Sequence, residues 1–137
     1  KKTRFNITID PKMAFGTGHH QTTYMMCRAL LQNEDSVRGK VVMDMGCGTG
    51  VLAILAAKMG AIDCVAIDND CWAADNAKEN VERNGVKVDV FLGSPSDFHS
   101  VIVGKSFVSP LNVPVTFIRE ESKFVSSILI VAVLLLL

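Results

Sequence analysis

The stretch "VVMDMGCGTGVLAILAAKMG", residues 41–60, joins two apolar runs through a loop that contains three glycines. The first run, "VVMDM", is short and rich in valine, which favours a strand buried on both faces. The second run, "GVLAILAAKMG", is typical of a helix, with Lys58 in its last turn and Gly60 as its stop. A strand, a glycine loop and a helix in this order are typical of an α/β domain.

The residues that follow repeat this alternation. "CVAID", residues 64–68, predicts a second buried strand, and "DCWAADNAKENVERNG", residues 70–85, predicts a second helix. The apolar stripe of that helix is expected to consist of Trp72, Ala73, Ala77 and Val81. "VKVDVFLG", residues 86–93, alternates as a third strand. The predicted fold class is therefore α/β, with a Rossmann-like, doubly wound parallel sheet and right-handed crossovers.

The remaining segments are predicted from shorter patterns. "RFNITI", residues 4–9, alternates like a strand, and a helix is expected near residues 24–32 with Thr22 or Thr23 as its cap. "KENVER", residues 78–83, indicates a solvated helix face. Residues 94–137 hold three of the four prolines and show no readable strand–helix unit. We expect them to be a divergent continuation of the same domain, so that the sheet is incomplete or altered at its C-terminal end.

Composition narrows the function classes. With 137 residues, half of them apolar, the chain can bury one modest core. Fourteen basic and fourteen acidic residues cancel, so no global charge favours nucleic acid or an anionic membrane. The apolar end "SSILIVAVLLLL" is too short to span a bilayer and predicts a buried strand or helix, with a severed anchor as the weaker alternative. The missing initial Met indicates a fragment or a trimmed chain.

The cysteines and histidines offer no metal site. The cysteines lie at positions 27, 47, 64 and 71. Their spacing matches neither a zinc ribbon nor a redox pair, which favours free thiols in a reducing cytoplasm. His19 and His20 are adjacent and have no third ligand at a useful spacing, so a polar loop is favoured over a metal centre. Cys47, inside the glycine loop, is interpreted as a small packing residue because no base for a nucleophile is in view.

The glycine loop predicts a ligand at the carboxyl edge of the sheet, beside the N–H groups that begin the following helix. A dinucleotide fingerprint would read GxGxxG, but here the third glycine comes one residue early and Val51 takes its place. Asp44, two residues before Gly46, would repel a pyrophosphate but could accept hydrogen bonds from an ammonium group or orient the loop. Asp68 ends the second strand, where a carboxylate can bind ribose hydroxyls. These features favour S-adenosylmethionine over a nicotinamide dinucleotide.

Three motifs carry a family resemblance over about residues 7–93. "MDMGCGTGVLAI" and "AIDND" resemble the cofactor motifs of class I methyltransferases. "IDPKMAFGTGHHQTT", together with "AKENVERNGV", is similar to PrmA-type enzymes, which methylate the stalk-base protein of the large ribosomal subunit, protein number eleven. The resemblance implies an S-adenosylmethionine-dependent N-methyltransferase that acts on lysine ε-amines or an N-terminal amine of a ribosomal protein. Residues 1–93 would then form the cofactor-binding core.

The resemblance also implies site residues. Thr23, Gly46 and Asp68 match the family's cofactor contacts, and the loop around Phe15, Thr17 and Gly18 would fold over the cofactor. With the loop residues argued above, the expected cofactor site is Thr17, Gly18, Thr23, Asp44, Gly46, Cys47, Gly48 and Asp68. Trp72 is a candidate to cover the adenine ring, with core packing as the alternative. No residue is assigned as the catalytic base.

The chain departs from the family in two places. The family's N-terminal recognition domain is not present in these residues, and the Asn motif expected after a fourth strand is not recognisable in "SVIVGKSFVSPLNVPVTF", residues 100–117. "VIV" could be that strand, but Asn112 is a poor match to the motif. Two alternatives to an active methyltransferase therefore stay open. They are an inactive cofactor-binding fragment and, less favoured, a nicotinamide-dependent oxidoreductase.

Overall fold

The computed structural model describes residues 3–12, 21–94 and 128–132. Its elements in chain order are α1 (Gln21–Gln32), η1 (Glu34–Ser36), β1 (Val41–Met45), α2 (Val51–Lys58), β2 (Asp63–Asp68), α3 (Cys71–Asn84), β3 (Asp89–Leu92) and β4 (Ile128–Ala132). The strands and helices predicted over residues 41–85 are thereby confirmed to within one or two residues. The third strand is shorter than residues 86–93, because only its last part pairs with β2.

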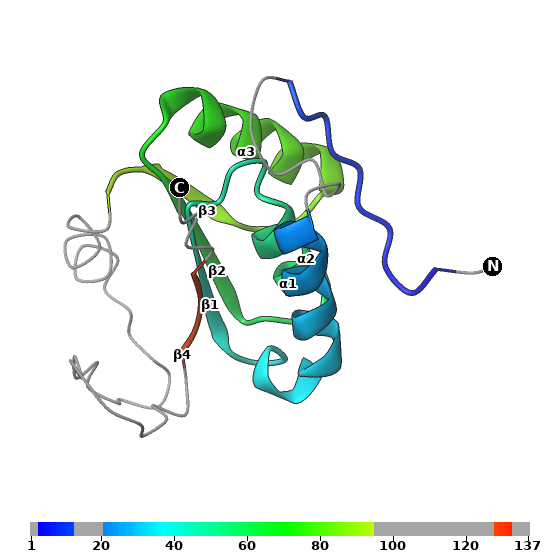
Figure 1. The fold of residues 1–137 in the computed structure, drawn as a ribbon. Coiled ribbons are helices and arrows are strands. Elements are labelled where there is room, and N and C mark those ends of the chain that lie inside the picture. Colours follow the sequence, from blue (N-terminus) through cyan, green and yellow to red (C-terminus); the bar gives the residue numbers. More distant parts are fainter. Residues whose placement is uncertain (1–2, 13–20, 95–127, 133–137) are drawn as a thin grey trace.

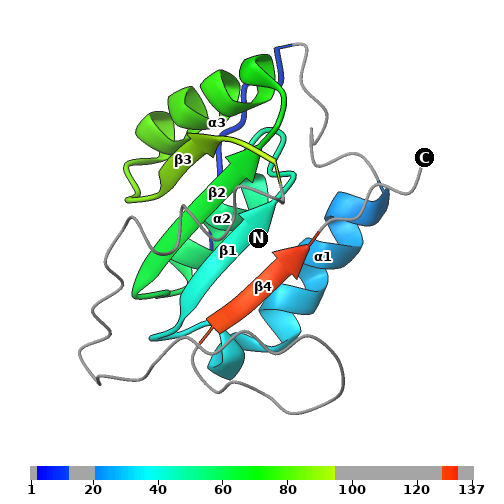
Figure 2. The same ribbon diagram turned by 90° about the vertical axis from the view of Figure 1, so that its left-hand side faces the viewer.

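The four strands form one parallel sheet in the order β3-β2-β1-β4. From β1 the chain steps outward to β2 and β3, and it then returns to place β4 on the other side of β1 (Figure 2). This reversal is the doubly wound arrangement, and it confirms the predicted fold class. In such sheets ligands bind outside the carboxyl ends of the strands, at the point where the strand order reverses. Here that point lies between β1 and β4.

The two strands β1 and β2 are buried on both faces, as their apolar residues predict. The helices α1, α2 and α3 lie on one side of it (Figures 1 and 2). Val42, Cys64 and Ala66 belong to the core shared with α2, in which six of the eight helical residues are buried. The alternate residues Met43 and Val65 belong to a second cluster and are at most 1 % exposed. The period of two along each strand separates these two layers.

Residues 4–9 do not form the strand that their alternation predicts. They run as an extended segment along the helices, on the side away from the sheet (Figure 1). Phe5, Ile7 and Ile9 still pack against the core, which explains the apolar alternation. The backbone N–H and C=O of Thr8 pair with the side chain of Asn84 at 2.9 and 2.7 Å, so a helix side chain replaces the neighbouring strand.

Two details of the helices also correct the sequence-based expectation. α1 begins at Gln21, so Thr22 and Thr23 lie within its first turn rather than at its cap. In α3 the N-cap is Asp70, whose carboxylate accepts the N–H of Trp72 at 3.0 Å. Trp72 is 76 % exposed and does not belong to the buried stripe, because at 3.6 residues per turn it lies roughly 100° around the helix from Ala73, outside the face formed by Ala73, Ala77 and Val81.

Gly50, between the loop and α2, has a positive φ of +80°. A Cβ atom built on it would lie 3.2 Å from the Cβ of Ala77 in α3. The loop and α3 therefore approach each other so closely at this point that only a glycine fits without displacement. This contact sets the distance between the glycine loop and α3.

We expect Gly50→Ala to lower the free energy of unfolding by about 2–4 kcal/mol, since left-handed strain and overpacking add. Gly39→Ala is the matched control, because Gly39 has a φ of +70° but nothing within 4 Å of the added Cβ. The control should cost only about 1–2 kcal/mol, the strain alone. Urea denaturation of both variants measures the difference. Equal losses would show that the approach of Ala77 carries no cost.

Candidate functional site

The loop after β1 is held by the end of β2. The backbone N–H groups of Gly46 and Cys47 both donate to the carbonyl of Ile67, at 2.8 and 3.0 Å. The glycines at 46, 48 and 50 have φ values of +73°, +54° and +80°. Residues with a Cβ rarely adopt this left-handed conformation, so the spacing of the glycines follows from the path of the backbone.

Asp68 closes the loop from the side of β2. One of its oxygens accepts the N–H of Gly48 at 2.8 Å, and the other accepts the N–H of Asp70 at 3.0 Å. The residue is 9 % exposed. A carboxylate offers about four lone-pair sites, so two remain for a ligand. Asp68 therefore shapes the loop and keeps the capacity to accept hydrogen bonds from hydroxyl groups.

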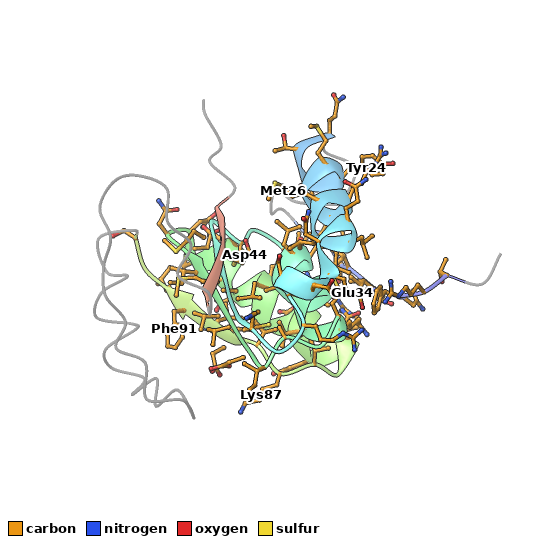
Figure 3. All side chains as sticks on the ribbon, turned by 90° about the horizontal axis from the view of Figure 1, so that it is seen from below. Tyr24, Met26, Glu34, Asp44, Lys87 and Phe91 are labelled. Carbon is orange, nitrogen blue, oxygen red and sulfur yellow. The ribbon has the colours of Figure 1, made fainter. Side chains whose placement is uncertain are left out.

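Asp44 is buried at 1 % exposure, and neither of its side-chain oxygens has a hydrogen-bond partner in the described part of the chain. It lies on the side of the sheet that faces the helices (Figure 3). Burial raises the pKa of this carboxyl to about 7. The N–H of Ala53, which approaches without completing a hydrogen bond, lowers that pKa, and the negative charge of Asp68 raises it.

Among the residues that the structure describes, the ionisable groups that interact with Asp44 are one acid, Asp68, and the thiols of cysteine residues. The charge of Asp44 raises the pKa of the Cys27 thiol in α1 and, with Asp68, that of Cys47, although burial is the larger cause in both. Neither these residues nor Ala53 brings a positive charge to the carboxylate. A buried anion without a partner is costly, so the site suits a ligand that brings a cation with hydrogen-bond donors. An ammonium group has this chemistry.

Cys47 occupies the middle of the loop but is unsuited to nucleophilic chemistry. It is 6 % exposed and belongs to the apolar core. Burial raises its thiol pKa far above the usual range, so it stays protonated and poorly nucleophilic at neutral pH. This agrees with its interpretation as a small packing residue.

The structure brings Asp44, Gly46, Cys47, Gly48 and Asp68 together at one edge of the sheet. Thr23 is buried at 8 % exposure in the first turn of α1. Thr17 and Gly18 lie outside the described residues, as do Phe15, His19, His20, Asn112 and the segment "VIV". The cofactor site predicted from the sequence remains a prediction for all of its members, which are Thr17, Gly18, Thr23, Asp44, Gly46, Cys47, Gly48 and Asp68.

Sequence reasoning missed a row of asparagines on α3. Asn76 and Asn80 are 3 % and 0 % exposed, and Asn84 follows one turn later. The interpretation of residues 78–83 as a solvated face is therefore wrong at Asn80, which is buried, whereas the burial of Val81 confirms its place in the predicted apolar stripe. The signal was available in the sequence, because three residues of one type at a spacing of four lie on one helix face.

No group of three or more His, Cys, Asp or Glu side chains in the described residues could hold a metal ion. None of the helices among them is long and apolar enough to cross a membrane.

Comparison with protein families places the chain. The family model described as "Ribosomal protein L11 methyltransferase (PrmA)" matches residues 1–111, which extends beyond the residue 93 expected from the motifs. A ribosomal protein L11 methyltransferase of Bacteroides fragilis is 53 % identical over 85 residues, 62 % of this chain and 30 % of the relative. That of Photobacterium profundum is 41 % identical over 128 residues, 90 % of this chain and 40 % of the relative. The chain thus spans about a third of the length of such relatives.

Solved structures agree with the fold. A ribosomal protein L11 methylase from Lactobacillus delbrueckii subsp. bulgaricus has a TM-score of 0.57 and 33 % identity, covering 74 % of this chain and 52 % of that one. The 16S rRNA N2 G1207 methyltransferase of Thermus thermophilus, solved with AdoMet and guanosine, has a TM-score of 0.53 and 26 % identity. It covers 58 % of this chain and 22 % of its own.

The buried carboxyl of Asp44 generates a pH-dependent prediction. Between about pH 4 and pH 7 the folded protein keeps a proton that an unfolded aspartate has lost, so stability falls as pH rises through this window. Asp44→Asn removes this dependence. We expect the free energy of unfolding of the variant, relative to wild type, to rise by up to about 4 kcal/mol from pH 4 to pH 8.

Urea denaturation at several pH values measures this difference. Asp75→Asn is the control, because Asp75 is an exposed aspartate on α3 whose side chain is 72 % accessible. Its stability should follow that of the wild type at every pH. Parallel pH profiles for Asp44→Asn and wild type would contradict the burial of an unpaired carboxyl.

Proposed function

The chain belongs to the PrmA family of ribosomal protein L11 methyltransferases, and on this premise we propose that it binds S-adenosylmethionine and methylates amino groups of a ribosomal protein. The observation that carries the proposal is Asp44, a buried carboxylate without a partner beside a glycine loop. S-adenosylmethionine carries an ammonium group, which is the partner that this carboxylate lacks. A nicotinamide dinucleotide would bring phosphates to the same edge, where Asp44 repels them.

The residues at the edge of the sheet fit the other parts of the cofactor. Gly46, Cys47 and Gly48 form a loop without bulky side chains, next to the free N–H groups that begin α2, which suits a carboxylate. Asp68 has lone pairs left for ribose hydroxyls. By family resemblance Thr17, Gly18 and Thr23 complete the site. In this proposal residues 1–93 are the cofactor-binding core and residues 94–137 continue the same domain.

The cofactor, when bound, supplies a methyl group on a sulfonium, a good leaving group that needs no covalent enzyme intermediate. The protein's part is then to hold a neutral amine in line and to exclude water. A lysine amine, with a pKa of about 10.4, has to lose a proton first. We assign no residue of this chain to that proton transfer.

The substrate proposed is ribosomal protein L11, the stalk-base protein named by the family model and the curated relatives. Because acidic and basic residues balance, the proposal includes no direct contact with nucleic acid and no membrane partner. The proposal includes a cytoplasmic location, because a ribosomal protein is the proposed substrate.

The two alternative functions differ from the proposed one in the cofactor that is bound or in whether a methylated product is formed. The nicotinamide-dependent oxidoreductase has little support, since Val51 begins α2 where a dinucleotide fingerprint has glycine. The inactive cofactor-binding protein is the stronger alternative, because the Asn motif expected after a fourth strand is not recognisable in residues 100–117.

The first test is calorimetric titration of the chain with S-adenosylmethionine and with NAD. We expect saturable binding of the sulfonium cofactor only, and a mass gain of one or more methyl groups on purified L11 when both are incubated with the chain. Binding without methylation would support the inactive fragment. Binding of NAD alone would overturn the proposal.

We expect Asp68→Ala to weaken S-adenosylmethionine binding by about tenfold or more, since it removes both the ribose acceptor and the hydrogen bond that holds Gly48. Asp70→Ala is the matched control. Asp70 lies two residues away and caps α3, and its loss should lower stability without changing cofactor affinity more than slightly. Titration of both folded variants measures the contrast, and unchanged affinity in Asp68→Ala would contradict the assignment.

A further inference from the structure

One buried side chain contacts both the glycine loop and the N-terminal segment. Asn80 of α3 is 0 % exposed. Its Nδ2 donates to the carbonyl of Thr49 at 3.1 Å and to that of Asp10 at 3.3 Å, and its Oδ1 accepts the N–H of Asp10 at 2.9 Å. We call residues 8–10 the entry segment. A single amide therefore joins the entry segment to the loop that follows β1.

The orientation of this amide depends on the entry segment. Nδ2 has two hydrogens but three acceptors within 3.5 Å, namely Thr49, Asp10 and the Oδ1 of Asn76. The carbonyl of Asp10 also receives the Nδ2 of Asn76 at 2.8 Å, so it does not rely on Asn80. The N–H of Asp10 and Arg83 Nη1 both donate to Oδ1 at 2.9 Å. Because the amide is planar, fixing Oδ1 in this way aims Nδ2 at Thr49.

The peptide group that Asn80 holds in the loop has hydrogen-bonded neighbours on its C-terminal side, so its orientation matters. Thr49 directly precedes Gly50, whose N–H donates to the carbonyl of Cys47 at 2.8 Å. The carbonyl of Gly50 accepts the N–H of Ile54 at 2.9 Å and so begins the helical hydrogen bonds of α2. The peptide that Asn80 holds therefore lies between the turn of the loop and the first turn of the helix.

We propose that Asn80 is a positioning residue that couples docking of the entry segment to the geometry of the cofactor loop. Cofactor binding then orders residues 8–10, and an ordered entry segment strengthens cofactor binding by the same factor, since coupling between two sites is reciprocal. The inference rests on the proposed function, because it takes the loop to be where S-adenosylmethionine binds.

The chain contains a matched control in the same row of asparagines. Asn84 pairs with both backbone groups of Thr8 and also donates to the carbonyl of Asn80 at 2.8 Å. These hydrogen bonds hold the entry segment as Asn80 does, but they do not reach the loop. A variant at Asn84 therefore loosens the segment and leaves Thr49 held.

The experiment combines calorimetry with hydrogen exchange followed residue by residue by NMR, using S-adenosylhomocysteine as the probe. In the wild type we expect the probe to slow exchange of the Asp10 amide by about threefold or more. In Asn80→Ala the affinity should fall by about tenfold, the loss of one buried hydrogen bond, and the slowing at Asp10 should vanish. In Asn84→Ala the Thr8 amide should exchange faster, while affinity falls less than about threefold.

A second variant covers failure of Asn80→Ala to fold. Asn80→Asp keeps an acceptor for the N–H of Asp10 and for Arg83 but removes the donor to Thr49. It should keep the Asp10 amide protected without the probe and bind the probe at least about tenfold more weakly, because an oxygen now faces the carbonyl of Thr49 in place of a donor.

The outcomes separate the coupling from the function. If the wild type binds the probe with no change at Asp10, or if Asn84→Ala loses as much affinity as Asn80→Ala, the coupling is overturned and the function stands. If the amides throughout β1 and β2 exchange faster in Asn80→Ala to the same extent as the Asp10 amide, Asn80 has a merely structural role and the coupling is overturned as well. If the wild type does not bind the probe at all, the proposed function falls and the coupling falls with it.

Discussion

The path of the backbone between β1 and α2 is the constraint on which the rest of the structure depends. In five residues the chain leaves the sheet, turns through three left-handed glycines and enters a helix that is buried on nearly every side. The turn is held at its start by Ile67, in its middle by Asp68 and at its end by α3. The first two supports come from β2 and the third comes from α3, so β1, β2 and α3 have to be in place together for the loop to form.

The same arrangement leaves Asp44 in an unfavourable state. Asp44 lies one residue before the end of β1, on the helix side of the sheet, and the charges described near its carboxyl are negative rather than positive. Burying such a group costs stability unless it is protonated or paired. A site that tolerates this cost is one in which pairing is supplied by the ligand. Stability of the free protein and affinity for a cation are therefore opposed at this residue.

The sequence predicts the parts of the fold whose signals are local. The valine-rich strands, the apolar helix α2 and the glycines that follow α2 and α3 are all indicated by adjacent residues, and they lie where the patterns predict. Residues 4–9 could not be predicted in this way, because their alternation reflects contact with helices, and their backbone partner is the side chain of Asn84. The placement of Trp72 in the apolar stripe was wrong for a different reason, since its apolar side chain was weighed above its position, which helical geometry puts outside the face of Ala73, Ala77 and Val81. In the site, Asp44 and Asp68 were identifiable from strand ends, whereas the role of Asn80 depends on a distant segment meeting α3.

The order of the strands has a consequence for how the sheet assembles. β1, β2 and β3 follow one another along the chain, so their pairings close short stretches and can form early. β4 pairs with β1 in parallel, with Val41 opposite Ile128, and this contact joins residues that are 87 positions apart in the sequence. Loop-closure entropy grows only slowly with length, but folding rates fall as contacts become less local. The glycine loop, together with Asp68 and α3, therefore belongs to the fast-forming half of the sheet. The edge of the sheet where the strand order reverses is completed only when the slow β1–β4 pairing forms.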